Sequence, residues 1–513
     1  MKVTARILLL LSLLAFASGC AVNPVTGKRE ITLVGEASEI QMGQQNYAPM
    51  QQSQGGEYDI DPALTAYVDT VGQRLAAVSD RPLPYEFVVL NNSVPNAWAL
   101  PGGKIAINRG LLTELNSEAE LAAVLGHEIV HAAARHTARR MEQGYLLQGL
   151  VLATAVATSD SDYGNFAVGG ANVAAQLVSQ KYGRSAELES DYYGMQYMKR
   201  AGYNPEGAVS LQQTFLRLSD GRRTDWLSGL FASHPPSAER VATNIKTAAE
   251  LGAGGEFGEQ RFAQVMARTK AAEPAYKAYD EGRKALGEKK PQEALAKAER
   301  AIGLLPDEAH FYALRGDARL VQKDYKGAIQ NYDIAQRRRP DFFYYYLQRG
   351  RAYEQTGNYS AAEADLEKSL TLLPTAPAHL TLGDIAARRG NKAKALEHYK
   401  VVAQGDGEVA QAAQTSMTRL DIGQNPGTYI QNRCDPDGSG NLVVSVRNAT
   451  QLPVRGVSFA VQYNDSAGRV RQLQKSVSQT LAPGEIASVN TGLGGYTAGS
   501  ACPVAITSAS VAE

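Results

Sequence analysis

Apolar and polar positions divide the chain into three regions with different periodicities. From about residue 35 to 250, apolar residues recur at helical spacing and are interrupted by short strand-like runs. From about 275 to 410 the spacing is helical throughout. From about 425 to 513, β-branched residues alternate with polar ones between turn residues, as in "NLVVSVRN" and "GVSFAVQYND". We therefore predict a multidomain α+β protein that ends in a small antiparallel β-sandwich.

The middle region repeats with a period of 34 residues. Three sets of positions share this spacing: Gly282, Gly316 and Gly350; Ala294, Ala328 and Ala362; and Pro306, Pro340 and Pro374. Small residues let two helices approach closely, and Pro ends the second helix. A period of 34 with these positions is typical of tetratricopeptide repeats, which stack as helical pairs into an α-solenoid. We predict about four such pairs.

The first twenty residues, "MKVTARILLLLSLLAFASGC", have the pattern of an export signal. Two basic residues precede an apolar run, and small residues follow up to Cys20. "ASGC" resembles a bacterial lipobox and predicts lipidation of Cys20, with a plain cleaved signal peptide as the alternative. No later segment has the roughly 18 apolar residues that a spanning helix requires. In a Gram-negative host, we expect a lipid-anchored protein of the periplasm that is tethered to the outer membrane.

The charge balance argues against nucleic-acid binding, and the cysteines predict one disulfide. The chain has 52 basic and 52 acidic residues, so its net charge is zero and no basic surplus favours nucleic-acid binding. Of its three cysteines, Cys434 and Cys502 remain once Cys20 is assigned to the lipobox. Because an exported chain meets an oxidising compartment, we predict a disulfide between these two cysteines, with two buried thiols as the alternative.

The segment "NSEAELAAVLGHEIVHAAARHTARRMEQG" predicts one long helix that begins with a capping box at Ser117 and ends at Gly144. Each residue of a helix turns by about 100°, so His127 and His131 share one face. His136, nine residues after His127, is predicted on roughly the opposite side, in a structural role.

Two histidines one helical turn apart suit a single zinc ion. Glu128 is predicted beside their face, where its carboxylate can act as a general base without binding the ion. An ordinary helix with core or solvated histidines is the alternative.

Catalytic zinc needs a third protein ligand, and the segment "GRSAELESDYYGMQYMKRAGYNP" is the best source. It predicts a helix with Glu187 and Asp191 on one face. One carboxylate can bind zinc while the other orients a ligand histidine. A solvated acidic face is the alternative, and Glu189 points elsewhere.

These motifs resemble the gluzincin zinc metallopeptidases grouped with the CAAX prenyl protease and HtpX. The resemblance covers about residues 20–250 and is greatest to a soluble bacterial branch, lipoproteins or periplasmic proteins with C-terminal tetratricopeptide repeats. It rests on "CAVNPVTGKRE", "NAWALPGGKIAINRGLL", "HEIVHAAARH", "AELESD" and "SHPPSAER". In that family the third ligand is the Glu of an ExxAD-type motif, which implies Glu187 as ligand and Asp191 as its acidic partner. Ser190 stands where the family usually has Ala.

The resemblance also implies residues that bind substrate. "NAWALPGG" resembles the family's edge strand beside the zinc, to which an extended peptide can add by main-chain hydrogen bonds. The implied substrate-binding residues are Asn96, Ala97, Trp98 and Ala99. An ordinary core strand is the alternative.

"SHPPSAER" lies near the site in the family. The resemblance implies one of two roles for His234. The side chain either stabilises the oxyanion, or it caps the open position of zinc and keeps the enzyme latent. The resemblance also implies that Arg240 pairs with an acidic residue close to the zinc. A helix start in which Pro-Pro sets the turn is the alternative.

We therefore expect a leader over 1–20, a mainly helical zinc metallopeptidase domain over 21–255, the repeats over 270–415 and the β-sandwich over 425–513. The expected function is a zinc metalloendopeptidase with one Zn²⁺ per chain, acting on misfolded or stalled envelope proteins such as outer-membrane assembly components. The repeats would recruit these protein clients. The alternative is a chaperone or assembly factor for outer-membrane proteins with a latent zinc site.

Overall fold

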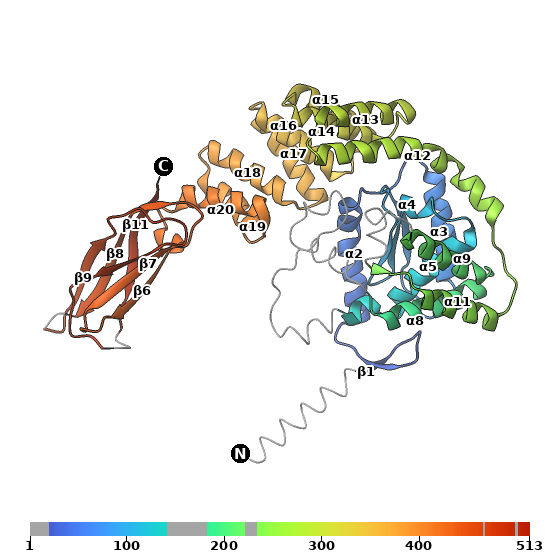
Figure 1. Cartoon of the computed structure of the whole chain (residues 1–513), viewed down its shortest axis with the longest axis horizontal. Coiled ribbons are helices and arrows are strands. Elements are labelled where there is room, and N and C mark those ends of the chain that lie inside the picture. The colour runs from blue at the N-terminus through green and yellow to red at the C-terminus, as the bar shows by residue number, and fades with distance from the viewer. Residues whose placement is uncertain (1–19, 141–181, 221–232, 465–466, 498–500, 513) are drawn as a thin grey trace, which may run out of the picture. The chain divides into compact units, whose positions relative to one another are not determined.

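The computed structural model describes residues 20–140, 182–220, 233–464, 467–497 and 501–512 (Figure 1). Residues 1–19 of the leader predicted over 1–20 lie outside this part of the chain, as does the side chain of Cys20. The chain divides into two compact units, 1–375 and 376–513, which are described separately. The division falls inside the predicted repeat array, so repeat helices occur in both units. None of the described helices is both long and apolar enough to cross a membrane.

The first unit contains a three-stranded sheet of order β3-β5-β4, in which β5 is parallel to β3 and antiparallel to β4. The strands are β3 (Glu86–Leu90), β4 (Ala97–Leu100) and β5 (Lys104–Asn108). Successive side chains of a strand point to opposite faces. One face, with Val88 and Trp98, packs against α2 (Glu36–Ser53). The other face joins the main core with α3 (Pro62–Ala76) and α5 (Glu118–Ala133), so the sheet is covered on both sides.

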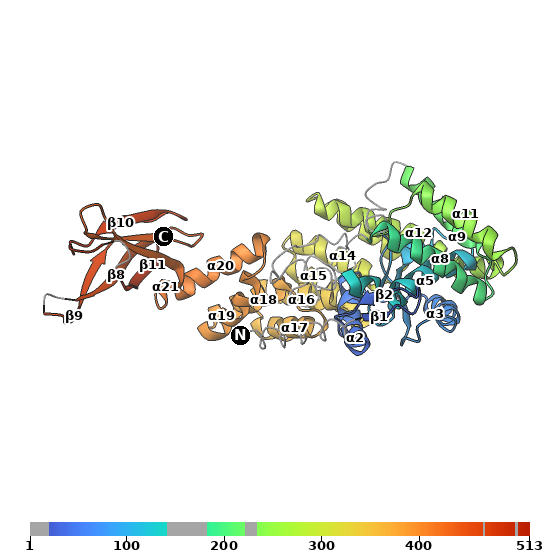
Figure 2. The ribbon, with the colours of Figure 1, turned by 90° about the horizontal axis from the view of Figure 1, so that it is seen from below.

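Helix α5 carries the histidine motif and packs against two further helices, α8 (Arg184–Arg200) and α9 (Glu206–Asp220), while α11 (Ala238–Leu251) packs against both of these, as Figures 1 and 2 show. Every residue of α5 is buried, as expected for a helix enclosed on all sides. Before these elements, β1 (Cys20–Val22) and β2 (Arg29–Ile31) form an antiparallel hairpin.

Helix α5 begins where the sequence predicts but ends earlier. The Ser117 hydroxyl accepts a hydrogen bond from the backbone N–H of Glu120, which caps the first turn. The Glu120 carboxylate accepts from the backbone N–H of Asn116 instead of completing the box with Ser117. The helix stops at Ala133, so the prediction of one continuous helix up to Gly144 is wrong.

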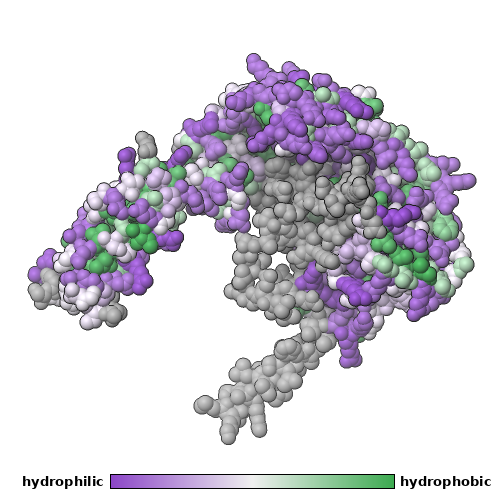
Figure 3. Space-filling view, in the orientation of Figure 1, coloured by the Kyte–Doolittle hydropathy of each residue, from purple (hydrophilic) through white to green (hydrophobic). Residues whose placement is uncertain are grey.

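The repeat region of the first unit is a series of antiparallel helices. They are α12 (Glu259–Gly287), α13 (Pro291–Leu304), α14 (Ala309–Val321), α15 (Tyr325–Arg338), α16 (Phe343–Gln355) and α17 (Tyr359–Leu372). The face of these helices that is visible in Figure 3 is mostly hydrophilic. Close packing explains the repeated glycines. A Cβ on Gly316 would lie 2.7 Å from the ring of Tyr332, and one on Gly350 would lie 2.8 Å from Leu366. Only glycine lets the two helices of each pair approach this closely.

The second unit continues with helices and ends in strands. Its helices are α18 (Ala376–Arg388), α19 (Lys392–Ala403), α20 (Gly407–Asp421) and α21 (Pro426–Tyr429). Its strands are β6 (Ile430–Pro436), β7 (Leu442–Asn448), β8 (Val454–Asn464), β9 (Val470–Ser476), β10 (Ile486–Asn490) and β11 (Val504–Val511). They form two antiparallel sheets, β10-β7-β6 and β11-β8-β9, around one apolar core. A disulfide joins Cys434 in β6 to Cys502.

Candidate active site

Four buried side chains converge between α5, α8 and the segment that precedes α11. They are His127, His131, Glu187 and His234, and one ligand atom from each lies within 4.8 Å of all the others. Nε2 of His127 is 3.0 Å from Nε2 of His131 and 3.3 Å from Nδ1 of His234. Ligands of a tetrahedral zinc ion are about 3.3 Å apart, because each is about 2 Å from the ion. The donor set and its spacing therefore fit one such ion.

Two glycines allow the helices α5 and α8, which carry three of these side chains, to meet. Gly126 on α5 and Gly194 on α8 face each other, and a Cβ on Gly194 would lie 3.0 Å from the backbone nitrogen of His127. The helix backbones are thus nearly in contact. This approach brings Glu187, one turn into α8, next to the histidines of α5. Gly194, inside an otherwise helix-favouring segment, was the sequence signal of this contact, and we did not predict its role.

Asp191 and Arg240 hold two of the cluster's side chains in place. The Nδ1 atom of His127 lies 2.9 Å from Asp191 Oδ1, which leaves Nε2 facing the cluster. Arg240 donates to both carboxylate oxygens of Asp191, at 2.7 Å each, and its Nη1 lies 2.9 Å from Glu187 Oε2. The guanidinium therefore fixes the directions of both carboxylates relative to the histidines.

Glu128 lies beside the cluster and outside its set of ligand atoms. Its Oε1 is 3.6 Å from Nε2 of His234, and its buried Oε2 has no hydrogen-bond partner among the described residues. Burial raises the pKa of Glu128, although His234 and His127 oppose this effect. An unsatisfied buried carboxylate oxygen next to a ligand cluster can accept a proton from a water molecule or substrate there.

The charges of the cluster favour an ionised Glu187. Burial by itself would raise the pKa of this carboxyl, but His234 and hydrogen bonds from His131 and His234 hold it well below its usual range. Burial also lowers the pKa of His131 well below its usual value, although Glu187 opposes this. A carboxylate and a neutral imidazole are the forms of these residues that bind metal ions.

His136 lies next to His131, so the prediction that it points to the opposite side of the helix is wrong. After Ala133 the chain turns through Ala134 and Arg135, and Arg135 has a φ of 60°, in the left-handed region. A new helical segment then starts at His136. This turn brings Nδ1 of His136 to 2.9 Å from Nδ1 of His131.

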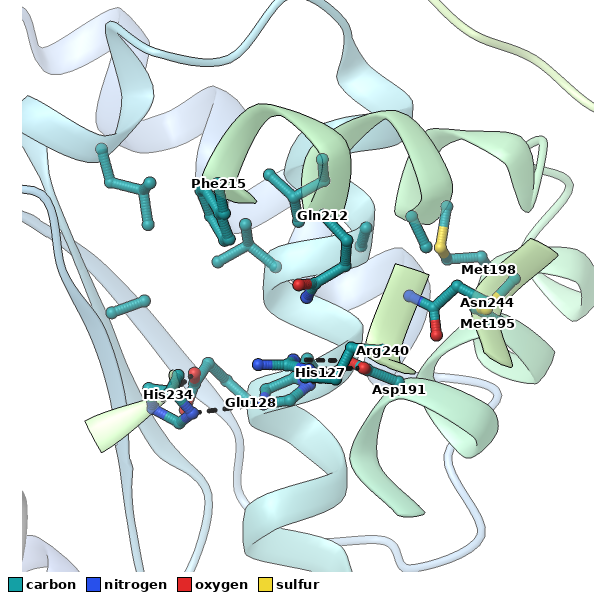
Figure 4. Close-up of a pocket in the computed structure, with 16 residues that line it drawn as sticks. His127, Glu128, Asp191, Met195, Met198, Gln212, Phe215, His234, Arg240 and Asn244 are labelled. Atoms are coloured by element: carbon teal, nitrogen blue, oxygen red, sulfur yellow. Dashed lines mark hydrogen bonds and ion pairs between the residues drawn. The ribbon is translucent and has the colours of Figure 1, made fainter. Parts of the chain in front are cut away.

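A pocket lies beside His127 and Glu128 (Figure 4). Most of its wall is apolar and consists of Ala97, Leu111, Ala123, Val124, Met195, Met198, Ala208, Leu211 and Phe215. The side-chain amides of Gln212 and Asn244 also point into it. Both residues are buried, and Gln212 Oε1 and the two amide atoms of Asn244 have no hydrogen-bond partner among the described residues. The sequence carried no signal for these two polar residues.

The strand predicted to bind substrate is β4, which lies at an edge of the sheet. Of its residues, Ala97 lines the pocket and Ala99 faces the main core. Trp98 faces the other side of the sheet, where its ring centroid is 6.1 Å from that of Tyr47. The buried Oδ1 of Asn96 has no hydrogen-bond partner in the described structure.

Sequence comparisons match two parts of the chain. The profile of peptidase family M48 matches residues 62–247, and that of the tetratricopeptide repeat matches 279–341 and 347–411. The tetratricopeptide prediction is therefore confirmed.

Curated proteins with similar sequences are named as proteases. The "Putative beta-barrel assembly-enhancing protease" of Vibrio cholerae is 35% identical over 187 residues, which are 34% of this chain and 36% of that protein. The "Beta-barrel assembly-enhancing protease" of Escherichia coli is 28% identical over 236 residues, 44% of this chain and 47% of that protein. The "Metalloprotease YcaL" of Escherichia coli is 30% identical over 197 residues, 36% of this chain and 73% of that protein. The match thus spans between a third and a half of the first two relatives.

Proposed function

Because the chain belongs to peptidase family M48, we propose that it is a zinc-dependent metalloendopeptidase with one ion per chain. The observation that carries this proposal is the buried cluster of two histidines and one glutamate with a second glutamate beside it. His127, His131 and Glu187 are the proposed zinc ligands. A catalytic zinc site has three such protein ligands, and its fourth position is open to water or substrate.

The reaction requires a base and an oriented set of ligands. A zinc ion at this position would act as a Lewis acid and make water a nucleophile at neutral pH. Glu128 takes the proton from the attacking water and delivers it to the leaving amine. Asp191 keeps the Nδ1 proton of His127 in place, and Arg240 orients Asp191 and Glu187. The apolar pocket receives a side chain of the substrate, and β4 pairs with its main chain.

Between the two roles expected for His234, capping has the stronger support. The Nδ1 atom of His234 lies 3.1 Å from Glu187 Oε1 and 3.3 Å from His127 Nε2, which is the spacing of a fourth ligand. A side chain in this position excludes the water molecule that attacks the substrate. We therefore propose that this arrangement is latent and that His234 must move before peptide bonds are hydrolysed.

The rest of the chain supplies the proposed substrate class and location. Tetratricopeptide repeats present extended surfaces for protein binding, so the repeats would recruit a protein client. Two relatives are named for enhancing β-barrel assembly, and this suggests misfolded or stalled envelope proteins as clients. The predicted leader and lipobox would tether the enzyme through Cys20 to a membrane, with the outer membrane facing the periplasm as the proposed location.

A second candidate function is a chaperone or assembly factor for outer-membrane proteins. The observation that favours it is the position of His234, which has the spacing of a fourth ligand and in that role would keep the zinc site silent. The two functions differ in whether the cellular role needs Glu128. An assembly factor would retain its role after Glu128→Gln, whereas a peptidase would lose it.

The direct test uses protein that lacks residues 1–20, purified without chelator. One zinc per chain and cleavage of casein that Glu128→Gln abolishes would establish the peptidase. Bound zinc without cleavage by wild type would point to latency and make His234→Ala the next variant. Protein without zinc would overturn the proposal.

A further inference from the structure

The two histidines of the HExxH motif are supported in different ways on the side that faces away from the cluster. The Nδ1 atom of His127 faces a carboxylate, Asp191. The Nδ1 atom of His131 faces another imidazole, that of His136, at 2.9 Å. Since both histidines direct Nε2 toward the cluster, a partner at Nδ1 decides which ring nitrogen carries the proton.

The protons along this contact follow from the ligand role proposed for His131. When Nε2 of His131 binds a metal ion, the proton of this ring is on Nδ1. This N–H group then donates a hydrogen bond to Nδ1 of His136. His136 must then carry its own proton on Nε2. The Ser190 hydroxyl, 3.3 Å from the same Nδ1 of His136, can donate to it as well, which is consistent with an acceptor at this atom.

Glu189 completes the series. Its Oε2 lies 3.4 Å from Nε2 of His136, an ion-pair contact without hydrogen-bond geometry, so a carboxylate lies close to the nitrogen that must carry the proton. The Glu189 side chain also contacts Lys28, whose Nζ is 2.6 Å from Oε1. Lys28 belongs to the turn of the β1–β2 hairpin. This hairpin is attached to the end of α5 because Asn23 donates to the backbone carbonyl of Ala134 at 3.0 Å.

The backbone is bent at the point that makes this contact possible. A continuous helix would carry His136 away from His131, whereas the left-handed φ of Arg135 turns the chain back. Non-glycine residues adopt this conformation when surrounding contacts require it, often at functional sites. The Arg135 guanidinium is held by the backbone carbonyl of Val34 at 2.6 Å and by the Thr32 hydroxyl at 2.8 Å.

We propose that His136 and Glu189 are positioning residues for the metal ligand His131, and that the β1–β2 hairpin holds Glu189 in place through Lys28. This inference rests on the proposed function, since it assumes that the cluster binds zinc. His136 keeps the His131 ring in the tautomer and orientation that direct the Nε2 lone pair into the cluster. Glu189 does the same for His136, and the segment that follows Cys20 thereby becomes part of the support of the metal site.

The test measures the zinc affinity of the full chain in detergent by competition with a chelator, together with the thermal stability of the zinc-free protein. His136→Leu removes the acceptor for His131. His136→Asn retains an oxygen close to the position of Nδ1. We expect His136→Leu to weaken zinc binding by about 10- to 100-fold, the usual effect of losing such a partner. We expect His136→Asn to restore most of this loss.

Two further variants complete the design. Glu189→Ala is expected to weaken zinc binding several-fold with little effect on folding, because Glu189 lies at the edge of the buried region. The matched control is His379→Leu, which breaks a similar contact, 3.0 Å between Nδ1 of His379 and Nδ1 of His398, in α18 and α19. The control should leave zinc affinity unchanged.

The outcomes separate this inference from the proposed function. If the wild type does not bind zinc, the proposed function fails and the inference fails with it. If the wild type binds zinc and His136→Leu binds it equally well, the inference alone is overturned. It is also overturned if Leu and Asn at position 136 weaken binding equally, because His136 would then act through packing only.

Discussion

Nε2 of His127 and Nδ1 of His234 lie 3.3 Å apart, although 107 residues separate them in the chain. Two nitrogen ligands of one tetrahedral zinc ion would be about this far apart. In the proposed zinc site, this contact puts His234 at the position that the substrate carbonyl or the attacking water would need. Removal of this imidazole is therefore the change that most directly distinguishes a latent site from an open one.

His234→Ala is expected to increase casein cleavage several-fold while zinc stays bound, because three protein ligands remain and the fourth position becomes open. Zinc content and initial cleavage rates of the purified variant and wild type measure this. The capping role would be contradicted if the cleavage rate fell by about 10²–10³-fold with zinc retained, which is the effect of losing an oxyanion donor.

Glu128→Gln is expected to lower the cleavage rate by about 10²–10⁴-fold, the contribution of a general base, without loss of zinc. In the wild type the Glu128 carboxylate lies outside the set of ligand atoms, so the variant should keep the ion. Glu114→Gln is the control, because burial also raises the pKa of Glu114 but this residue lies outside the cluster. Loss of zinc from the Glu128 variant would argue that this residue binds the ion.

Gly194→Ala is expected to separate α5 from α8. The new Cβ would lie 3.0 Å from the backbone nitrogen of His127 and 3.1 Å from the carbonyl carbon of Gly126, so the helices must move. We expect the free energy of unfolding to fall by about 1–3 kcal/mol, the usual cost of overpacking, and zinc affinity to fall with it. Urea unfolding and chelator competition provide these values.

Gly287→Ala is the control for that variant. Gly287 ends α12, and a Cβ there would meet no atom within 4 Å, so alanine should stabilise the helix by about 0.5–1 kcal/mol. Equal effects of the two substitutions would show that the contact between α5 and α8 is not tight.

His310 on α14 is expected to make stability depend on pH. Its Nε2 lies 2.9 Å from the backbone carbonyl of Gly55, which follows α2. Burial lowers the pKa of His310 to about 4, against a value near 6.5 in the unfolded chain, and Arg339 acts in the same direction. A neutral histidine in the fold is fully stabilising above pH 6.5, and this contribution is lost as the pH falls towards 4.

The shift in the pKa of His310 sets the size of this effect. We expect it to lower the free energy of unfolding by on the order of 3 kcal/mol between pH 7 and pH 4. Because other groups also titrate in this range, the measurement compares wild type with His310→Gln by urea unfolding at both pH values. The variant should lose less stability on acidification. Identical pH dependence in both proteins would contradict a buried neutral His310.

Features that depend on local periodicity were predictable from the sequence. The four-residue spacing of His127 and His131 places both on one face of any helix, and a start signal at Ser117 set where that helix begins. The 34-residue period predicted helical pairs, and glycines such as Gly316 occupy positions where a side chain would collide with the partner helix. These relationships hold within a helix or a helical pair, so they need no knowledge of distant contacts.

The tertiary structure decided what lies outside these local relationships. His136 was predicted on the far side of α5, but Arg135, held by contacts to Thr32 and Val34, ends the helix and returns His136 to His131. Helical geometry cannot anticipate such a turn, because the groups that stabilise it lie about a hundred residues away.

The chain by itself determined the pair of proposed ligands on α5, the proposed base between them and the repeat that follows. Residue spacing along one helix is set by the backbone, so these features can be read from the sequence. The meeting of Glu187 and His234 with that helix depends on how closely separate elements pack, and for Glu187 the approach of Gly194 to Gly126 permits it. Packing of this kind is a property of the whole core, and only the tertiary structure decided it.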